Sequence, residues 1–168
     1  MISFASEQMR QEYNKQLHPE VVAVISALHD FLKKGILNIT EVGRTDNESQ
    51  RIYTAIADRV LAVTDLNTLS PLDLNTRKQV ENLKREEVTK WARNKSSWHK
   101  PFAAVDIGLT NLSKDQITEA KKYLFAMCSR PMWELILESH GTGPHFHVGR
   151  RDFVWLKNFP GGTKHAPD

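Results

Sequence analysis

One carboxylate lies inside an apolar run of the chain. The run from Phe102 to Ile107 has the length and composition of a buried β-strand, and Asp106 is its only charged residue. A carboxylate removed from water must be paired with positive charge or bound to a cation, because its desolvation is otherwise too costly. The fold must therefore bring basic side chains or a metal ion to this strand.

Three histidines are candidates for that role. His99 lies shortly before Asp106 in the sequence, in a segment predicted to be a loop. His145 and His147 flank Phe146 in a short predicted strand, where residues i and i+2 share a face. Two imidazoles on one face suit a metal ion or a proton-transfer role. Such a pair is also common on a polar surface, and the triplet alone leaves that alternative open.

His99, Asp106 and His147 together offer two nitrogen donors and one oxygen donor, a set that Zn²⁺ accepts. A catalytic zinc keeps three protein ligands and a water, whose pKa it lowers to about 7. His145 would then stay off the metal as a proton shuttle or oxyanion stabiliser. Glu138, on the preceding strand, is a candidate general base. Ligand types alone do not separate Zn²⁺ from another divalent ion.

The remaining sequence predicts an α+β fold with a small antiparallel sheet flanked by helices. Apolar residues at helical spacing predict a helix from His18 to Gly35, and capping boxes beginning at Thr45 and Ser113 predict two more. A charged helix is expected within 75–95. Strands are expected at about 38–43, 102–108, 132–139 and 145–150, the last two as a hairpin, with 150–157 extending the sheet.

The 168 residues are expected to form one domain, with 1–16 as an arm or short helix and 158–168 as a loose tail. We expect a monomer. The protein is expected to be cytoplasmic as synthesised and not inserted in a membrane, because the sequence contains neither a secretory signal nor a long apolar run. The single cysteine, Cys128, excludes an intramolecular disulfide and has the apolar neighbours of a buried thiol.

The net charge of +3 allows attraction to a nucleic acid, a membrane surface or a cell-wall polymer. A basic nucleic-acid-binding domain built on 75–95 is therefore one alternative function. Acidic residues interleave the basic ones in that segment, which favours a solvated helix, so no nucleic-acid partner is expected. Trp98 and Trp155 either line a substrate groove or pack in the interior, and His18 is expected to be solvated.

Three segments resemble motifs of a known enzyme group. Ser97-x-His99-x-x-Phe102-x-Ala104-x-Asp106 resembles the Ser-x-His-x-x-Gly-x-Ala-x-Asp motif of the zinc D-alanyl-D-alanine carboxypeptidase family. Upstream, Gly43-Arg44-Thr45-x-x-Glu48-x-x-x-Ile52-Tyr53 is similar to that family's Arg-Ser/Thr-x-x-Glu-Gln-x-x-Leu-Tyr segment. Downstream, His145-x-His147 resembles the closing His-x-His of the wider group that includes lysostaphin-type endopeptidases and the hedgehog amino-terminal domain. The segments span residues 39 to 149 in the family's order.

The resemblance implies a zinc peptidase that cleaves peptidoglycan stem peptides, either at the terminal D-Ala-D-Ala bond or inside the stem. Its zinc ligands would be His99, Asp106 and His147, while Arg44 and Ser97 would face the carbonyl or carboxylate of the substrate. The implied fold is a small antiparallel sheet flanked by helices. Many small members of the group are phage endolysins, so the implied site of action is the cell wall.

The chain departs from the family pattern at three positions. Phe102 replaces a glycine, Ser49 replaces a glutamine, and Pro144 stands where the carboxypeptidases place their catalytic glutamate. Glu138 or His145 must then serve as the general base, or the metal alone activates water. A zinc-binding domain that has lost catalysis is the corresponding alternative.

Overall fold

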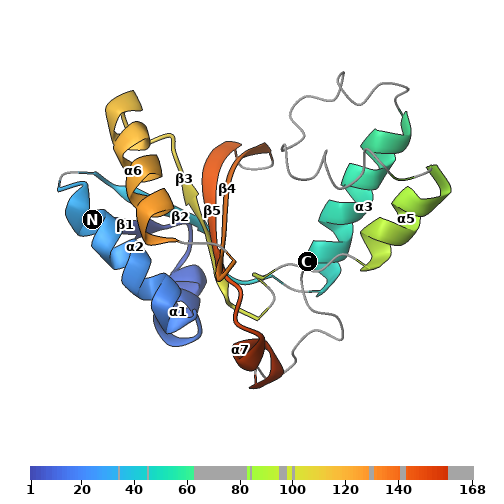
Figure 1. Cartoon of the computed structure of the whole chain (residues 1–168), viewed down its shortest axis with the longest axis horizontal. Helices are drawn as coiled ribbons and strands as arrows, with labels where there is room; N and C mark the ends of the chain where they lie inside the picture. The colour runs from blue at the N-terminus through green and yellow to red at the C-terminus, as the bar shows by residue number, and fades with distance from the viewer. Residues whose placement is uncertain are drawn as a thin grey trace.

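The computed structural model describes residues 1–33, 35–44, 46–62, 83, 85–94, 98–99, 101–128, 131–140 and 143–158. Its centre is a five-stranded sheet in the order β1-β2-β3-β5-β4 (Figure 1). The strands are β1 Ile2–Phe4, β2 Leu37–Glu41, β3 Ala104–Gly108, β4 Trp133–His140 and β5 Gly143–Arg150. β1 is parallel to β2 and the other neighbours are antiparallel, so the expected antiparallel sheet is in fact mixed.

Six helices accompany the sheet within the described ranges. They are α1 Glu7–Lys15, α2 Pro19–Phe31, α3 Asp46–Ala62, α5 Arg85–Asn94, α6 Lys114–Met127 and α7 Phe153–Asn158. The predicted capping box of α6 is present, since the side chains and backbone amides of Ser113 and Gln116 bond reciprocally. The expected N-cap of α3, Thr45, lies outside the described residues. None of the helices in the described ranges combines the length and the apolar character that a membrane crossing requires.

The main core lies between one face of the sheet and helices α2 and α6 (Figure 1). Alternate residues of the two central strands face it, namely Val105 and Ile107 of β3 and Phe146 and Val148 of β5. The residues between them, including Asp106, therefore face the other side of the sheet. The alternation that builds the core thus also places Asp106, His145 and His147 together on one surface.

Helices α3 and α5 lie on the opposite side of the sheet from α2 and α6 (Figure 1). They pack against each other through a separate apolar cluster formed by Ile56, Ala57, Val60, Val88 and Ala92. Only 85–94 and residue 83 of the charged segment predicted over 75–95 belong to the described residues, and 85–94 forms α5.

At the ends of the chain the structure adds one strand to the expected helix and corrects one expectation. Residues 1–16 contain a short strand, β1, as well as the helix α1. The segment after Arg150 does not extend the sheet, because the chain turns at Asp152 and forms the helix α7. The Asp152 carboxylate accepts hydrogen bonds from the backbone amides of Val154 and Trp155, which fixes the start of that helix. Residues 159–168 of the predicted tail lie outside the described residues.

Candidate metal centre

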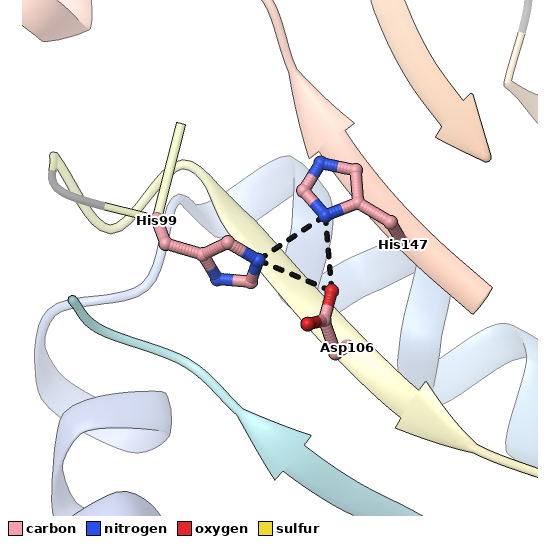
Figure 2. A group of neighbouring side chains, drawn as sticks. All are labelled: His99, Asp106 and His147. Atoms are coloured by element: carbon pink, nitrogen blue, oxygen red, sulfur yellow. Dashed lines mark hydrogen bonds and ion pairs between the residues drawn. The ribbon is translucent and has the colours of Figure 1, made fainter. Parts of the chain in front are cut away.

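The side chains of His99, Asp106 and His147 converge on one point (Figure 2). The Oδ1 atom of Asp106 lies 2.9 Å from Nδ1 of His147 and 3.1 Å from Nε2 of His99, and the two nitrogens are 3.1 Å apart. All three side chains are buried. The structure therefore brings together the three residues predicted as metal ligands.

The backbone explains why two of these side chains meet. β3 and β5 are antiparallel neighbours, and Asp106 is paired directly with His147 in their register. Directly opposed residues of an antiparallel pair project from the same face. His99 arrives from a turn before β3, which is closed by hydrogen bonds from the Phe102 amide to the His99 carbonyl and from the Ala103 amide to the Trp98 carbonyl.

Each imidazole of the cluster is oriented by a bond from its other ring nitrogen. Nδ1 of His99 lies 3.2 Å from the carbonyl oxygen of Val42, which can only accept a hydrogen bond. Nε2 of His147 lies 3.1 Å from Oε2 of Glu134 on β4. A neutral ring that donates from one nitrogen presents a lone pair on the other. Metal-binding histidines are held in this way, by a carbonyl or carboxylate on the far side of the ring.

The orientation of the rings favours a cation, either a proton or a metal ion, at the cluster. Nε2 of His99, Nδ1 of His147 and Oδ1 of Asp106 are all acceptors when both rings are neutral, yet they lie 2.9 to 3.1 Å apart. Acceptors at that separation repel unless a proton or a metal ion lies among them. The ligands of a tetrahedral Zn²⁺ are about 3.3–3.4 Å apart, so these atoms need to separate by only a few tenths of an ångström. The buried His–Asp–His group can hold a metal ion.

Charges at the cluster shift two pKa values in opposite directions. Burial alone would raise the pKa of Asp106, but the interactions of its carboxylate with His99 and His147 hold it well below its usual range. Burial alone would lower the pKa of His147, but hydrogen bonds to Asp106 and Glu134 raise it well above its usual value. Without a metal, a proton on His147 is thus the favoured cation of the cluster.

The role of Glu134 was not predicted from the sequence. It lies on β4, two residues from Ile136, which is paired with His147. Diagonal neighbours in antiparallel strands lie within reach of long side chains, which brings its carboxylate to the imidazole. Its alternation with Trp133 and Leu135, both buried in the core, is the signal that could have placed it on the polar face of the sheet, the face that carries Asp106, His145 and His147.

His145 lies beside the ligand cluster. Its Nδ1 donates to the carbonyl oxygen of Gly143 at 2.8 Å, and its Nε2 lies 3.6 Å from Oδ2 of Asp106, the oxygen that does not meet the other two imidazoles. The side chain is buried. Its position beside the cluster leaves it close enough to exchange a proton or form a hydrogen bond with a group bound there.

Arg44 is held next to the site by Glu41. Its Nε and Nη2 atoms lie 2.6 and 2.5 Å from the two carboxylate oxygens of Glu41. Burial lowers the pKa of the Arg44 guanidinium, but the paired carboxylate of Glu41 and the negative charge of Asp106 outweigh that effect and raise it. A permanent positive charge therefore lies within the electrostatic range of the cluster.

The side chains of two further predicted site residues, Ser97 and Glu138, are not among those that the structure describes. Ser97 lies outside the described residues. Glu138 pairs with His145 in the register of β4 and β5, and the structure describes its backbone alone.

Phe102, which stands where the motif has a glycine, has an unusual backbone conformation. Its φ of 53° lies in the left-handed region that glycine adopts readily and other residues rarely adopt. Its ring occupies the space beside Gly43, where an added Cβ would lie 2.3 Å from a ring carbon. The turn before Asp106 therefore has a backbone conformation that favours glycine, and the Phe102 ring fills the space over Gly43.

The expectation that His18 is solvated was wrong. His18 is buried, and its Nδ1 accepts a hydrogen bond from the Glu20 amide at the start of α2. Its Nε2 lies 3.2 Å from Oδ2 of Asp152, and its ring packs on Trp155. Trp98 is also buried, which agrees with packing in the interior. As predicted, Cys128 is buried, and burial raises the pKa of its thiol to about 11.

No family model, curated protein or solved structure matches the chain. The likeness to the zinc carboxypeptidase group accordingly rests on the motif residues, and the metal centre rests on the geometry of this chain.

Proposed function

We propose that the protein is a zinc-dependent peptidase that cleaves the stem peptides of peptidoglycan. The metal centre is supported by the convergence of His99, Asp106 and His147. The ring nitrogen of each histidine that faces away from the cluster contacts Val42 in one case and Glu134 in the other. The substrate class comes from the resemblance of the motif segments to the zinc carboxypeptidase group. The two parts of the proposal therefore have separate support and separate tests.

The donor set favours zinc over Mg²⁺ and Ca²⁺. Two imidazole nitrogens and one carboxylate oxygen suit Zn²⁺, whereas Mg²⁺ and Ca²⁺ prefer oxygen ligands throughout. Three protein ligands also leave one position of a tetrahedral ion for water or substrate. This ligand count is the one found in catalytic rather than structural zinc sites.

The residues around the cluster have roles that fit peptide hydrolysis. Bound zinc would supply a Lewis acid and a water of lowered pKa. His145 is placed to hold or transfer a proton beside Asp106. Glu138, opposite His145 in the strand register, is the second candidate for the general base. Arg44 provides a positive charge for the carbonyl or terminal carboxylate of the peptide, and Ser97 would assist it.

The enzyme would act on the cell wall as a monomer, in the manner of a phage-type lysis enzyme. Both a carboxypeptidase that removes the terminal D-Ala and an endopeptidase that cuts the L-Ala-D-Glu bond agree with the same centre. Product analysis of digested stem peptides distinguishes the two, because only the carboxypeptidase releases free D-alanine.

The first test is zinc content together with wall digestion. We expect about one zinc per chain in the wild type, lost in Asp106→Ala, and release of peptide fragments from purified peptidoglycan that stops in His147→Ala. His29→Ala is the matched control, since it removes an imidazole on α2 that is not in the metal cluster. Loss of zinc in His29→Ala as well, or a wild type that binds no zinc, contradicts the metal centre.

A non-catalytic zinc domain is the second candidate. It is favoured by Pro144, which occupies the place of the family's catalytic glutamate, and by the burial of all three ligands. This alternative predicts a wild type that binds zinc yet leaves both peptidoglycan and synthetic D-Ala-D-Ala peptides intact. Hydrolysis that is lost with chelation and restored by zinc argues against it.

A further inference from the structure

The turn that carries His99 is held by residues from both ends of the chain. We name as the His99 turn its described residues, 98–99 and 101–103. The backbone amide of His18 donates to the Phe102 carbonyl at 2.8 Å, and the indole Nε1 of Trp155 donates to the Pro101 carbonyl at 2.6 Å. The turn therefore takes two of its anchors from the start of α2 and from α7.

Two more contacts fasten the same turn near its ends. The Arg150 amide donates to the Ala103 carbonyl at 2.7 Å, just beyond the last strand. The ring of Phe153, the first residue of α7, meets the buried indole of Trp98 edge-on at 5.6 Å. Residues from 150 to 155 thus contact the turn on both sides of His99.

His18, Asp152 and Trp155 form one connected unit. One Asp152 oxygen accepts the amides of Val154 and Trp155 at 2.9 Å each, while the other lies 3.2 Å from Nε2 of His18. The imidazole of His18 and the indole of Trp155 are in contact, with ring centroids 4.7 Å apart. Moving α7 would therefore disturb the His18 side chain and the indole bond to Pro101 together.

The three proposed ligands depend on this unit to different degrees. Asp106 and His147 stand on paired strands in the middle of the sheet, so the hydrogen-bond ladder between β3 and β5 fixes their separation. His99 stands on no strand. Its imidazole reaches Asp106 only if the His99 turn is held at the correct height above β3.

We propose that His18, Asp152 and Trp155 are positioning residues that place Nε2 of His99 against the other two ligands. Metal binding and the docking of α7 are then coupled. This inference rests on the proposed metal centre and is independent of whether the protein cleaves a peptide. It assigns a function to the C-terminal helix α7, which contributes no ligand.

The coupling must be reciprocal, because a docked α7 that favours the metal is itself favoured by the metal. Residues that orient metal ligands typically change metal affinity 10- to 100-fold when they are replaced. Trp155 acts through the backbone of the turn, so we expect the lower end of that range, about 10-fold. We also expect zinc to slow hydrogen exchange at the Val154 and Trp155 amides by a comparable factor.

The experiment measures the zinc dissociation constant of the full chain by chelator competition, and hydrogen exchange at the two amides with and without zinc. Trp155→Phe keeps an aromatic ring and removes the Nε1 donor. Asp152→Ala removes all three contacts of its carboxylate, with the Val154 and Trp155 amides and with His18, whereas Asp152→Asn keeps an oxygen for the amides of α7. Val154→Ala is the control, since it lies on the same helix with a side chain that is 69% exposed.

We expect weaker zinc binding in Trp155→Phe and Asp152→Ala, partial recovery in Asp152→Asn, and no change in Val154→Ala. Visible spectra of the cobalt-substituted proteins should differ between wild type and Trp155→Phe, because a displaced His99 changes the ligand field. Unchanged affinity and spectrum in Trp155→Phe would overturn the inference and leave the metal centre intact, even if the variant melted at a lower temperature. A wild type that binds zinc and digests no peptidoglycan would leave the inference standing and refute the peptidase. A wild type that binds no zinc overturns both.

Discussion

The two faces of β3 and β5 are both buried and are stabilised in different ways. On one face Ile107 and Val148 are 0% exposed, and on the other Asp106 and His147 are 6% and 7% exposed. The first face gains free energy from each apolar group it removes from water. The second loses hydration energy on burial and recovers it only through specific partners.

This difference teaches how the same strands serve the fold and the site. An apolar contact is non-directional, so the core face depends on the volume and shape of its side chains. The polar face depends on the protonation and orientation of each ring, which Val42 and Glu134 determine from outside the cluster. Substitutions on the two faces should therefore differ in what they change, stability on one and metal affinity on the other.

The largest effect on stability is expected at Phe146, at the centre of the core face. Phe146→Ala removes a side chain that is 2% exposed and leaves a cavity against α2 and α6. We expect a loss of about 3–5 kcal/mol in the free energy of unfolding, measured by urea denaturation of the metal-free protein. Phe125→Ala on α6 is the matched control, because its ring is 56% exposed and its loss should cost less than about 0.5 kcal/mol.

The comparison would fail if both phenylalanine variants lost similar stability, since burial would then not decide the outcome. It would be sharpened if Phe146→Ala retained zinc affinity whenever it remained folded. That result would show that the core face supports the ligands only by keeping the strands in register.

The sequence predicted the metal-ligand residues better than the residues that contact them. Alternation along β5 is a local signal, so His145 and His147 could be placed on one face of that strand from their spacing alone. That Asp106 faces them depends on the pairing of β3 with β5. The contact of Glu134 with His147 could not be predicted, because it depends on the register between β4 and β5, which no single strand specifies.

Two elements at the ends of the chain were missed for related reasons. β1 has only three residues, too few for an alternating pattern to be recognised. The apolar residues of 153–156 fit a strand as well as a helix, and the Asp152 cap that decides for α7 is apparent only from its bonds. The burial of His18 follows from its contact with that same distant helix.

Glu134→Gln tests the polar face without removing a ligand. The amide keeps the shape of the carboxylate and loses the charge that holds the His147 imidazole with Nδ1 toward the cluster. We expect zinc affinity to fall about 10- to 100-fold, with a much smaller change in the stability of the metal-free protein than Phe146→Ala causes. Chelator competition measures the first quantity and urea denaturation the second.

Glu119→Gln, on the exposed part of α6, is the control for loss of one negative charge. Equal zinc affinity in both glutamine variants would remove Glu134 from the site.

The smallest effect concerns pH. Despite the opposing effect of burial, Asp106 and Glu134 raise the pKa of His147 in the folded, metal-free protein. The stability from its imidazolium is therefore fully present below the unfolded value and is lost as the pH rises through the folded pKa. Zinc requires the neutral ring, so binding must displace this proton, and affinity should increase about tenfold per pH unit below that folded pKa.

Calorimetric titrations in buffers of different ionisation enthalpy count the protons released on zinc binding. We expect about one proton near neutral pH in the wild type and fewer in Glu134→Gln, where one of the two carboxylates that raise the pKa is gone. Zinc binding without proton release in the wild type would mean that His147 is already neutral. In that case the facing acceptor atoms of His99, Asp106 and His147 would be buried together without a proton among them. That result would contradict the view that the buried polar groups are stabilised by specific partners.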